Sequence, residues 1–187
     1  MQYLALLRGI NVGGNNKVDM KQLKAVFEQT GMTAVSTYIN SGNVIFQSDT
    51  KNETELAAVL EKAIEQAFGF HVKVLIRSYA TMQTIAAELP AEWVNDATMK
   101  TDVMFLWEGY DTPEVVKRVT IKPEMDRVKY VPGALLWSVD RPNVTRSGLL
   151  KIIGTDLYRH MTVRNCNTFR KLITLMDVKH DTTEHSA

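Results

Sequence analysis

Residues 33–48, TAVSTYINSGNVIFQS, decide the fold, because two strand-like segments flank a short turn. Val35, Thr37 and Ile39 alternate on one side of the first segment, and NVIFQS continues beyond the turn. Asn and Gly in residues 40–43 tolerate the positive φ angles of a tight hairpin turn. The stretch therefore predicts two antiparallel strands joined directly.

A strand and a helix are expected on each side of this hairpin. The apolar run at residues 2–8 is typical of a buried strand. A helix is expected from Asp19, which caps it, to Gly31. Residues 56–69 carry apolar side chains at helical spacing, and HVKVLIR at residues 71–77 alternates as a strand. The order strand, helix, hairpin, helix, strand is that of the βαββαβ ferredoxin-like fold.

The second half of the chain repeats this order. Residues 102–108 are typical of a strand, and Thr112 and Pro113 have the residue types that begin a helix. The segments DRVKYV and ALLWSV predict a hairpin around residues 132–133, and a further helix is expected to end at Gly154.

We therefore predict an α+β fold of two ferredoxin-like (βαββαβ) halves related by internal duplication, with antiparallel sheets and helices packed on one face. The hairpins support the duplication, because YI, G and VIF in residues 38–46 match YV, G and LLW in residues 130–137, offset by one residue. The expected N-terminal half is residues 1–92. The C-terminal half, with an extra C-terminal helix, is residues 100–180, and residues 181–187 are expected to form a disordered tail.

The composition is that of an ordinary globular protein, with 45% hydrophobic residues, 23% charged residues and a net charge of +1. This charge gives no general attraction to nucleic acid or membranes, and no apolar run approaches the roughly 20 residues that span a bilayer. The single cysteine, Cys166, cannot form an internal disulfide. These features favour a cytoplasmic protein without membrane attachment.

Basic residues concentrate towards the two ends of the chain. Between Arg141 and Lys179, eight Lys or Arg residues stand against two Asp residues, and the first 26 residues hold four Lys or Arg against Asp19. The two segments either form one basic surface or are scattered, and the sequence leaves both arrangements open.

The loop in LLRGINVGGNNKVDM, residues 6–20, has the position of a phosphate-binding loop but not its chemistry. Gly9 and Gly14 have the separation of a P-loop, yet the Lys and hydroxyl residues that should follow directly are missing. Asp19 at the start of the next helix would also weaken the attraction of that helix for an anion. The sequence thus excludes a P-loop.

Two interpretations of this loop remain. Gly13 and Gly14 permit a reversed backbone, so that the loop only turns the chain. Alternatively, Arg8, Asn11 and Lys17 form a polar pocket in which the arginine binds an anion.

A second polar run, TVRNCNTFRKL, occupies residues 162–172. Asn165, Asn167 and Thr168 stand at a predicted helix start, where N-capping explains at least one of them. The basic residues of the run either bind an anion there or are solvated side chains; they are Arg164, Arg170 and Lys171.

Other chemistries have little support. Cys166 lies near Arg164 and a helix start, which would lower the pKa of its thiol, but no histidine stands in a diagnostic relation to it. No metal-ligand or hydrolase motif is present, and no cofactor is expected. Tyr3, Tyr38 and Phe46 are candidates for stacking on RNA bases, but burial of these rings between two packed sheets is the simpler expectation.

The segments ALLRGINVGGNNKVDM, GMTAVSTYINSGNVIF and TVRNCNTFRKL resemble the bacterial family of unknown function called DUF1697, from Tyr3 to about Met176. The resemblance implies an α+β protein with ferredoxin-like repeats and no established activity. Two positions depart from the family pattern, since Cys166 replaces a usual tryptophan and Gly148 replaces an expected lysine. The first weakens a thiol mechanism, and the second weakens an anion-binding role for residues 145–150. The characteristic polar and glycine positions of the family match Arg8, Gly9, Asn11, Gly13, Gly14, Ser41, Gly42, Asn43, Arg164, Asn165, Asn167 and Thr168.

The leading hypothesis is a cytoplasmic protein that binds an anionic ligand, which would be a nucleotide, a phosphorylated small molecule or a nucleic-acid phosphate. Both polar runs are rich in arginine and side-chain amides. The expected ligand-binding residues are Arg8, Asn11, Lys17, Ser41, Asn43, Arg164, Asn165, Asn167, Thr168 and Lys171, and the structural glycines are Gly9, Gly13, Gly14 and Gly42. The alternatives are an enzyme that acts on a small phosphorylated metabolite and a structural or protein-interaction module without a small ligand.

Overall fold

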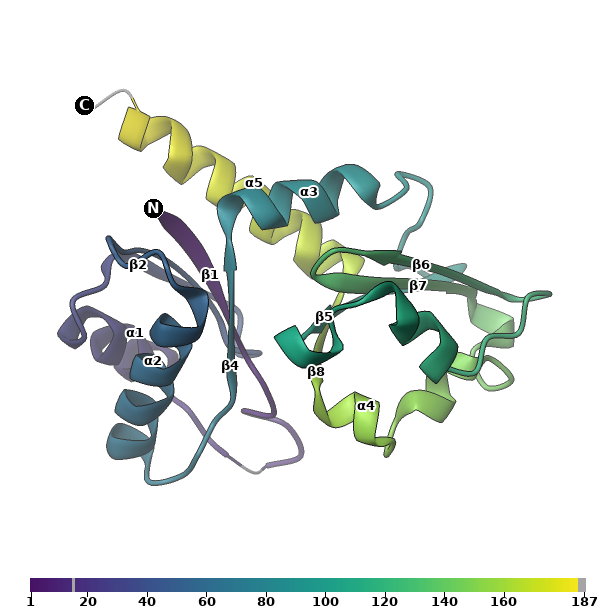
Figure 1. Ribbon diagram of the computed structural model, residues 1–187, viewed down its shortest axis with the longest axis horizontal. Coiled ribbons are helices and arrows are strands. Elements are labelled where there is room, and N and C mark those ends of the chain that lie inside the picture. Colours follow the sequence, from purple (N-terminus) through teal and green to yellow (C-terminus); the bar gives the residue numbers. More distant parts are fainter. Residues whose placement is uncertain (15, 185–187) are drawn as a thin grey trace. The chain divides into compact units, whose positions relative to one another are not determined.

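The computed structural model describes residues 1–14 and 16–184 (Figure 1). The chain forms two compact units. Unit 1 is Met1–Ala80 together with the C-terminal segment from Met176, and unit 2 is Thr81–Leu175. Within the described residues, no helix is both long enough and apolar enough to cross a membrane.

Unit 1 has the predicted ferredoxin-like topology. Its sheet has the strand order β2-β3-β1-β4, and all neighbouring strands are antiparallel. As predicted, Asp19 caps the first helix by accepting a hydrogen bond from the backbone N–H of Gln22. In chain order the elements are β1 (Gln2–Leu7), α1 (Met20–Gln29), β2 (Thr33–Tyr38), β3 (Asn43–Gln47), α2 (Glu53–Phe68) and β4 (Val74–Ser78), after which α3 (Tyr79–Glu88) begins.

Helices α1 and α2 cover one face of this sheet with apolar side chains. The rings of Tyr3 and Phe46 stack with their centroids 5.7 Å apart, and Phe27 of α1 meets Phe46 edge-on at 5.5 Å. Tyr3 and Phe46 are buried, as predicted, but they pack in the core beneath the helices rather than against a second sheet. Tyr38 is half-buried. Tyr3 and Phe46 are therefore unavailable for stacking on bases.

Unit 2 has the same strand order and the same antiparallel pairing, β6-β7-β5-β8. Its elements are β5 (Met99–Leu106), the 3₁₀ helices η1 (Glu108–Tyr110) and η2 (Pro113–Arg118), β6 (Asp126–Val131), β7 (Ala134–Asp140), the 3₁₀ helices η3 (Arg141–Asn143) and η4 (Gly148–Ile152), α4 (Asp156–Arg159), β8 (Met161–Asn165) and α5 (Cys166–Glu184). Helix α5 continues through residues 181–184, where the sequence predicts a disordered tail, and residues 185–187 lie outside the described residues.

The strand registers confirm the internal duplication position by position. The first strand of each unit is paired on both sides: Leu4 of β1 pairs with Ile45 and Arg77, and Val103 of β5 pairs with Leu136 and Arg164. Tyr3 of unit 1 therefore corresponds to Asp102 of unit 2, and Ser78 corresponds to Asn165. The two hairpins that match in sequence occupy equivalent places in the two sheets.

The segments that cover the sheets differ between the two units. Where unit 1 has helices of 10 and 16 residues, unit 2 has 3₁₀ helices and the four-residue α4. The predicted helices beginning at Thr112 and ending near Gly154 are therefore wrong in type and length. Proline at 113, 123 and 142 and β-branched residues such as Val115 and Val116 explain the short turns, because they disfavour a long α-helix.

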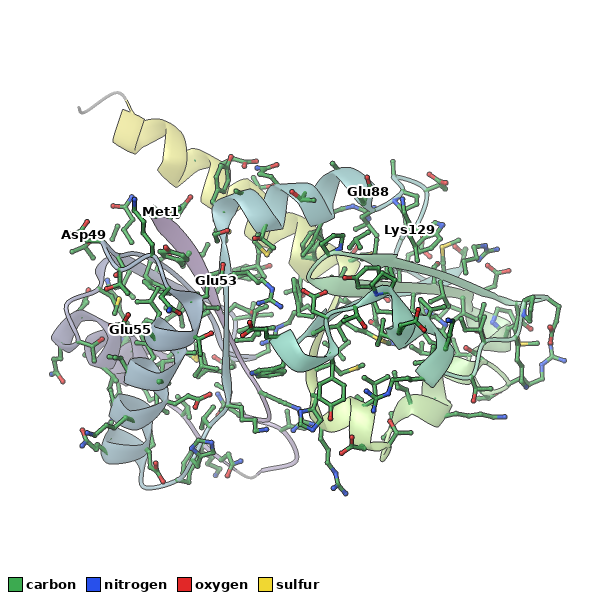
Figure 2. The ribbon with its side chains drawn as sticks, viewed as in Figure 1. Met1, Asp49, Glu53, Glu55, Glu88 and Lys129 are labelled. Carbon is green, nitrogen blue, oxygen red and sulfur yellow. The ribbon has the colours of Figure 1, made fainter. Side chains whose placement is uncertain are left out.

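Carboxylates fix helix ends to strands in both units (Figure 2). Glu53, at the start of α2, accepts a hydrogen bond from the backbone N–H of Ser78 at 2.7 Å and lies 3.5 Å from Nη1 of Arg77. Glu88, at the end of α3, lies 2.5 Å from Nζ of Lys129 on β6. These contacts hold each helix against the edge of its own unit.

Asp126 holds together the irregular segments of unit 2. Its carboxylate, only 6% exposed, accepts hydrogen bonds from the backbone N–H groups of Lys122 and Gly148, both at 2.9 Å. It also accepts from Nε1 of Trp137 at 3.3 Å and from the hydroxyl of Ser147. Burial raises the pKa of this carboxyl, but the hydrogen bonds outweigh burial and hold the pKa below its ordinary value.

Substitution of Gly148 by alanine is expected to destabilise the protein by about 3 kcal/mol, because a Cβ atom there would overlap the backbone carbonyl of Thr120. Gly109→Ala is the matched control, since a Cβ atom at Gly109 meets no atom within 4 Å. Urea denaturation of both variants measures the difference. Equal midpoints for the two variants would show that the Gly148 backbone has room to move.

Substitution of Asp126 by asparagine is expected to lower the free energy of unfolding at pH 7 by about 3 kcal/mol, because hydrogen bonds to a charged acceptor are lost. Since folding lowers the pKa of Asp126, its contribution is present above the unfolded value of about 3.9 and is lost as the pH falls through the folded value. The stability difference between wild type and variant should therefore shrink below about pH 4. Asp49→Asn, at an exposed position, is the control. If the stability difference between wild type and Asp126→Asn stayed constant down to pH 2, the lowered pKa of Asp126 would not be its source.

Candidate functional site

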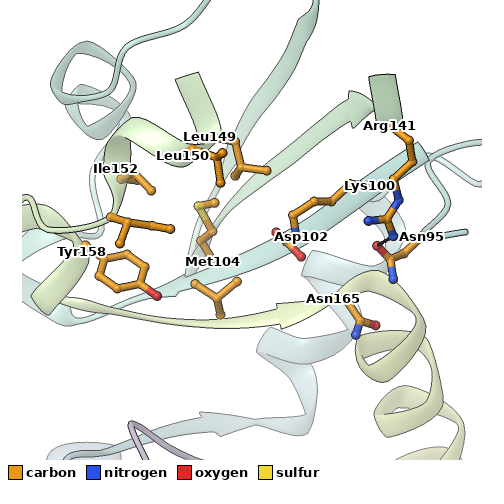
Figure 3. Close-up of a pocket in the computed structure, with 12 residues that line it drawn as sticks. Asn95, Lys100, Asp102, Met104, Arg141, Leu149, Leu150, Ile152, Tyr158 and Asn165 are labelled. Atoms are coloured by element: carbon orange, nitrogen blue, oxygen red, sulfur yellow. Dashed lines mark hydrogen bonds and ion pairs between the residues drawn. The ribbon is translucent and has the colours of Figure 1, made fainter. Parts of the chain in front are cut away.

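A cavity of about 410 Å³ lies in unit 2, and all of its lining residues belong to that unit (Figure 3). This volume is within the range of small-molecule sites, about 300–1,000 Å³. The cavity has a polar end and an apolar end (Figure 3). The polar end consists of Asn95, Lys100, Asp102, Arg141 and Asn165. The apolar end includes Met104, Leu149, Leu150, Ile152, Ile153 and Tyr158.

The cavity exists because short segments cover the sheet face of unit 2. Lys100, Asp102 and Met104 alternate along β5 and so point to the same face of the sheet. In unit 1 the equivalent face lies under α1 and α2, and Tyr3, the counterpart of Asp102, is part of that closed core. In unit 2, η4 and α4 supply one wall, and a space remains between that wall and β5.

An ion pair between a partly exposed lysine and a buried aspartate occupies the polar end. Nζ of Lys100 lies 2.7 Å from Oδ2 of Asp102, which is 6% exposed. Arg141 donates from Nη2 to the side-chain oxygen of Asn95 at 3.2 Å and from Nε to the backbone carbonyl of Asp96 at 2.8 Å. Within the described residues Arg141 forms no ion pair shorter than 4.0 Å. The charge of Lys100 is therefore offset locally, and that of Arg141 is directed at neutral oxygens.

The turn before β5 positions Asn95 and Arg141. The carboxylate of Asp96 accepts hydrogen bonds from the hydroxyl and the N–H of Thr98 and from the N–H of Met99, which lower its pKa. The nearby charge of Arg141 lowers this pKa too, to a smaller extent. Asn167 donates to the backbone carbonyl of Asn95 at 2.7 Å. The turn is thus fixed by the carboxylate of Asp96 within it and by Asn167 of α5.

Two aliphatic side chains at the apolar end are exposed to water. Leu150 is 41% exposed and Ile153 is 58% exposed, although both line the cavity. Apolar side chains at the edge of a cavity are the ones that a bound molecule would cover. The apolar end therefore opens to the surface rather than into a closed core.

Residues predicted to bind a ligand in unit 1 hold the opening loop in place. Asn11, at a positive φ of 54°, donates to the carbonyls of Val18 and Asn40 and accepts from the N–H of Val18. Gly13 and Gly14 have φ angles of 61° and 80°, in agreement with the predicted reversed backbone. Arg8 is partly exposed, and Gly9 and Lys17 are exposed.

The first hairpin uses its predicted residues in the same structural way. Asn43 is buried and donates to the carbonyl of Tyr38 and to the hydroxyl of Ser41, both at 3.0 Å. Gly42 has a φ of 76°, and a Cβ atom there would lie 2.7 Å from Cβ of Leu7. Side-chain amides here stabilise the turn.

The predicted residues around β8 have three different environments. Asn165 lines the cavity and caps α5, accepting from the N–H of Thr168 at 2.9 Å. Arg164 is 8% exposed, lies on the other face of β8, and donates to Thr162 and Val163; burial lowers its pKa to about 10. Lys171 is exposed.

The thiol of Cys166 is buried, and burial raises its pKa. The nearby charge of Arg170 acts in the opposite direction but is the smaller effect, so the expected lowering is wrong. Among the described residues, no group of three His, Cys, Asp or Glu side chains is placed to hold a metal ion.

The two predicted polar runs belong to different units. Arg8, Asn11 and Lys17 are in unit 1, whereas the run that begins at Arg164 lies in unit 2. The assembly of both runs into one site stays a prediction.

Four polar residues of the cavity were not predicted from the sequence, namely Asn95, Lys100, Asp102 and Arg141. For two of them the sequence contains a recognisable pattern. Lys100 and Asp102 alternate with Met104 on the same side of a strand that is apolar from Val103 onwards. Two charges on the inward face of a strand are unusual in a closed core.

Comparison with known proteins agrees with the fold. A conserved bacterial protein from Streptococcus pneumoniae has a similar structure, with a TM-score of 0.79 and 30% sequence identity over 92% of this chain and 97% of that one. No significant match is found among curated proteins. The family model described as "Protein of unknown function (DUF1697)" matches residues 1–137, which include residues 1–80 of unit 1 and, in unit 2, β5, β6 and the first part of β7. The chain thus belongs to the DUF1697 family, whose function is unknown.

Proposed function

We propose that the protein binds a small organic anion in the cavity of unit 2. The observation that carries this proposal is the division of the cavity into a cationic, amide-rich end and an aliphatic end (Figure 3). Small-molecule sites commonly combine apolar walls with a few polar groups that fix orientation. The anionic group would lie near Arg141, and the apolar body would lie over Met104 and Ile152.

The polar end supplies several hydrogen-bond donors for an anion. Arg141 supplies a guanidinium group, and the lining residues Asn95 and Asn165 each use a side-chain oxygen as an acceptor in the contacts above. Their amide N–H groups have no protein acceptor among the described residues. Arginine and amide donors together suit a phosphate or carboxylate group.

Of the residues predicted to bind an anion, this proposal keeps Asn165 in the cavity. It adds Lys100 and Asp102 of β5, Asn95 of the turn before β5, and Arg141 of η3. Arg8, Lys17 and Lys171 remain candidates for contacts with larger anionic ligands. The cytoplasm is the compartment we propose, because a chain with a single cysteine gains nothing from an oxidising environment.

Arg141→Ala is expected to weaken binding of 1-naphthyl phosphate roughly tenfold or more, because a hydrogen-bonded charge contributes about 1.5–3 kcal/mol. Arg146→Ala is the matched control. Arg146 is an exposed arginine on the same segment that bonds to Asn143, and it does not line the cavity. Isothermal titration calorimetry measures both affinities. Equal losses in the two variants would place binding elsewhere on a basic surface.

Ile153→Ser is expected to weaken binding of 1-naphthyl phosphate several-fold. The midpoint of thermal unfolding should not change, since the side chain of Ile153 is already exposed without ligand. Val59→Ser, at a similarly exposed aliphatic position on α2, should change neither quantity. Calorimetry and thermal unfolding of the two variants provide the comparison. Unaltered affinity in Ile153→Ser would remove the apolar end from the proposed site.

A further inference from the structure

We infer that the organic anion is a nucleoside 5′-monophosphate, with its ribose hydroxyls bound by Asp102. This inference rests on the proposed function and names the ligand class for the same cavity. It comes from the order of chemical groups along β5, from the free acceptor capacity of Asp102, and from the balance of charge at the polar end.

Three kinds of side chain follow one another along the cavity face of β5. Met104 lies at the apolar end, Asp102 in the middle and Lys100 at the polar end beside Arg141 (Figure 3). Alternate residues of a strand are about 7 Å apart, so these positions span about 13 Å. A ligand that follows the strand therefore has an apolar part, then hydrogen-bond donors, then an anion. Base, ribose and 5′-phosphate have this order.

Asp102 has more acceptor capacity than the protein uses. A carboxylate accepts about four hydrogen bonds. Within the described residues its one contact of this kind is with Lys100, at 2.7 Å, although the side chain is almost fully buried. Because a buried carboxylate is stabilised by each donor that reaches it, the remaining lone pairs favour a ligand with O–H groups on adjacent carbons. The 2′ and 3′ hydroxyls of ribose form such a pair.

The charges favour neutral donors and a single phosphate. Lys100 already neutralises Asp102, so an ammonium group on the ligand would leave an excess of positive charge at the polar end. Among the residues that line the cavity, Arg141 is the cation that forms no ion pair. One phosphate matches this single cation and the two amides beside it, whereas a triphosphate would carry charges with no counterpart in the cavity lining.

The apolar end suits a flat ring that keeps contact with water. Tyr158 and the aliphatic side chains of Met104 and Ile152 supply a surface for stacking and packing. Exposed Leu150 and Ile153 leave the edge of a bound base hydrated. We therefore expect purines to bind more tightly than pyrimidines, because they cover more apolar surface, and adenine and guanine to bind within about threefold of each other.

The test uses ligands that differ by one group each. Adenosine 5′-monophosphate is compared with its 2′,3′-dideoxy analogue, with adenosine and with ribose 5-phosphate, by isothermal titration calorimetry on the full chain. The dideoxy analogue should bind about tenfold more weakly or worse, because it cannot donate to Asp102. In Asp102→Ala this difference should fall to within twofold. In Arg141→Ala, adenosine and its monophosphate should bind with similar affinity.

The outcomes separate this inference from the proposed function. If the ribo- and dideoxynucleotide bind wild type equally, the role of Asp102 is overturned, while Arg141-dependent binding of 1-naphthyl phosphate would still support an organic-anion site. If the nucleotide fails to bind and 1-naphthyl phosphate binds, the nucleotide inference is overturned and the organic-anion proposal stands. If neither binds, both proposals fail. The comparison of the ribo- and dideoxynucleotide on wild type tests the role of Asp102 even if Asp102→Ala does not fold. Asp102→Asn, which keeps the side-chain shape, serves as the second variant.

Discussion

The apolar face of a β-sheet must be covered, and the two repeats of this protein meet that requirement with different segments. In unit 1, α1 and α2 close over the sheet, and the rings of Tyr3, Phe27 and Phe46 fill the space between them. In unit 2, short 3₁₀ helices and a four-residue α-helix cover the same face. Short segments cover less area than helices of three to five turns. The cavity over β5 therefore follows from the presence of short segments where unit 1 has long helices.

The short segments that cover the sheet of unit 2 need tertiary contacts to hold them in place. Isolated turns of helix have little stability of their own, so their positions depend on tertiary contacts. The carboxylate of Asp126 provides such contacts, since it binds the start of η4 through Ser147 and Gly148 and also binds Trp137 in the sheet. The same η4 segment carries the apolar wall of the cavity. The shape of the candidate site is thus set by hydrogen bonds outside it.

The sequence predicted the fold more completely than the site, for a physical reason. Alternation in residues 33–48 and helical spacing in residues 56–69 are local patterns, and the strand order follows once the hairpin is placed between two helices. The helix signals at Thr112 and Pro113 were read correctly as a start, but the residues after them determine whether an α-helix or a 3₁₀ turn follows. The site depends on which faces remain uncovered, and this is a tertiary property that no single segment encodes.

The loop asparagines did not distinguish a ligand-binding site from a structural turn. Asn11 and Asn43 have the composition of ligand-binding residues, yet their amides bond to backbone groups of their own loops, because one amide both donates and accepts. Asp102 is different in kind. A carboxylate in a closed core is costly unless it is paired, and at the equivalent position unit 1 has Tyr3, whose hydroxyl donates to the carbonyl of Thr50. In unit 2 the equivalent carboxylate is paired with Lys100 and lines the cavity, so this position distinguishes the sheet face that has a cavity from the one that helices close.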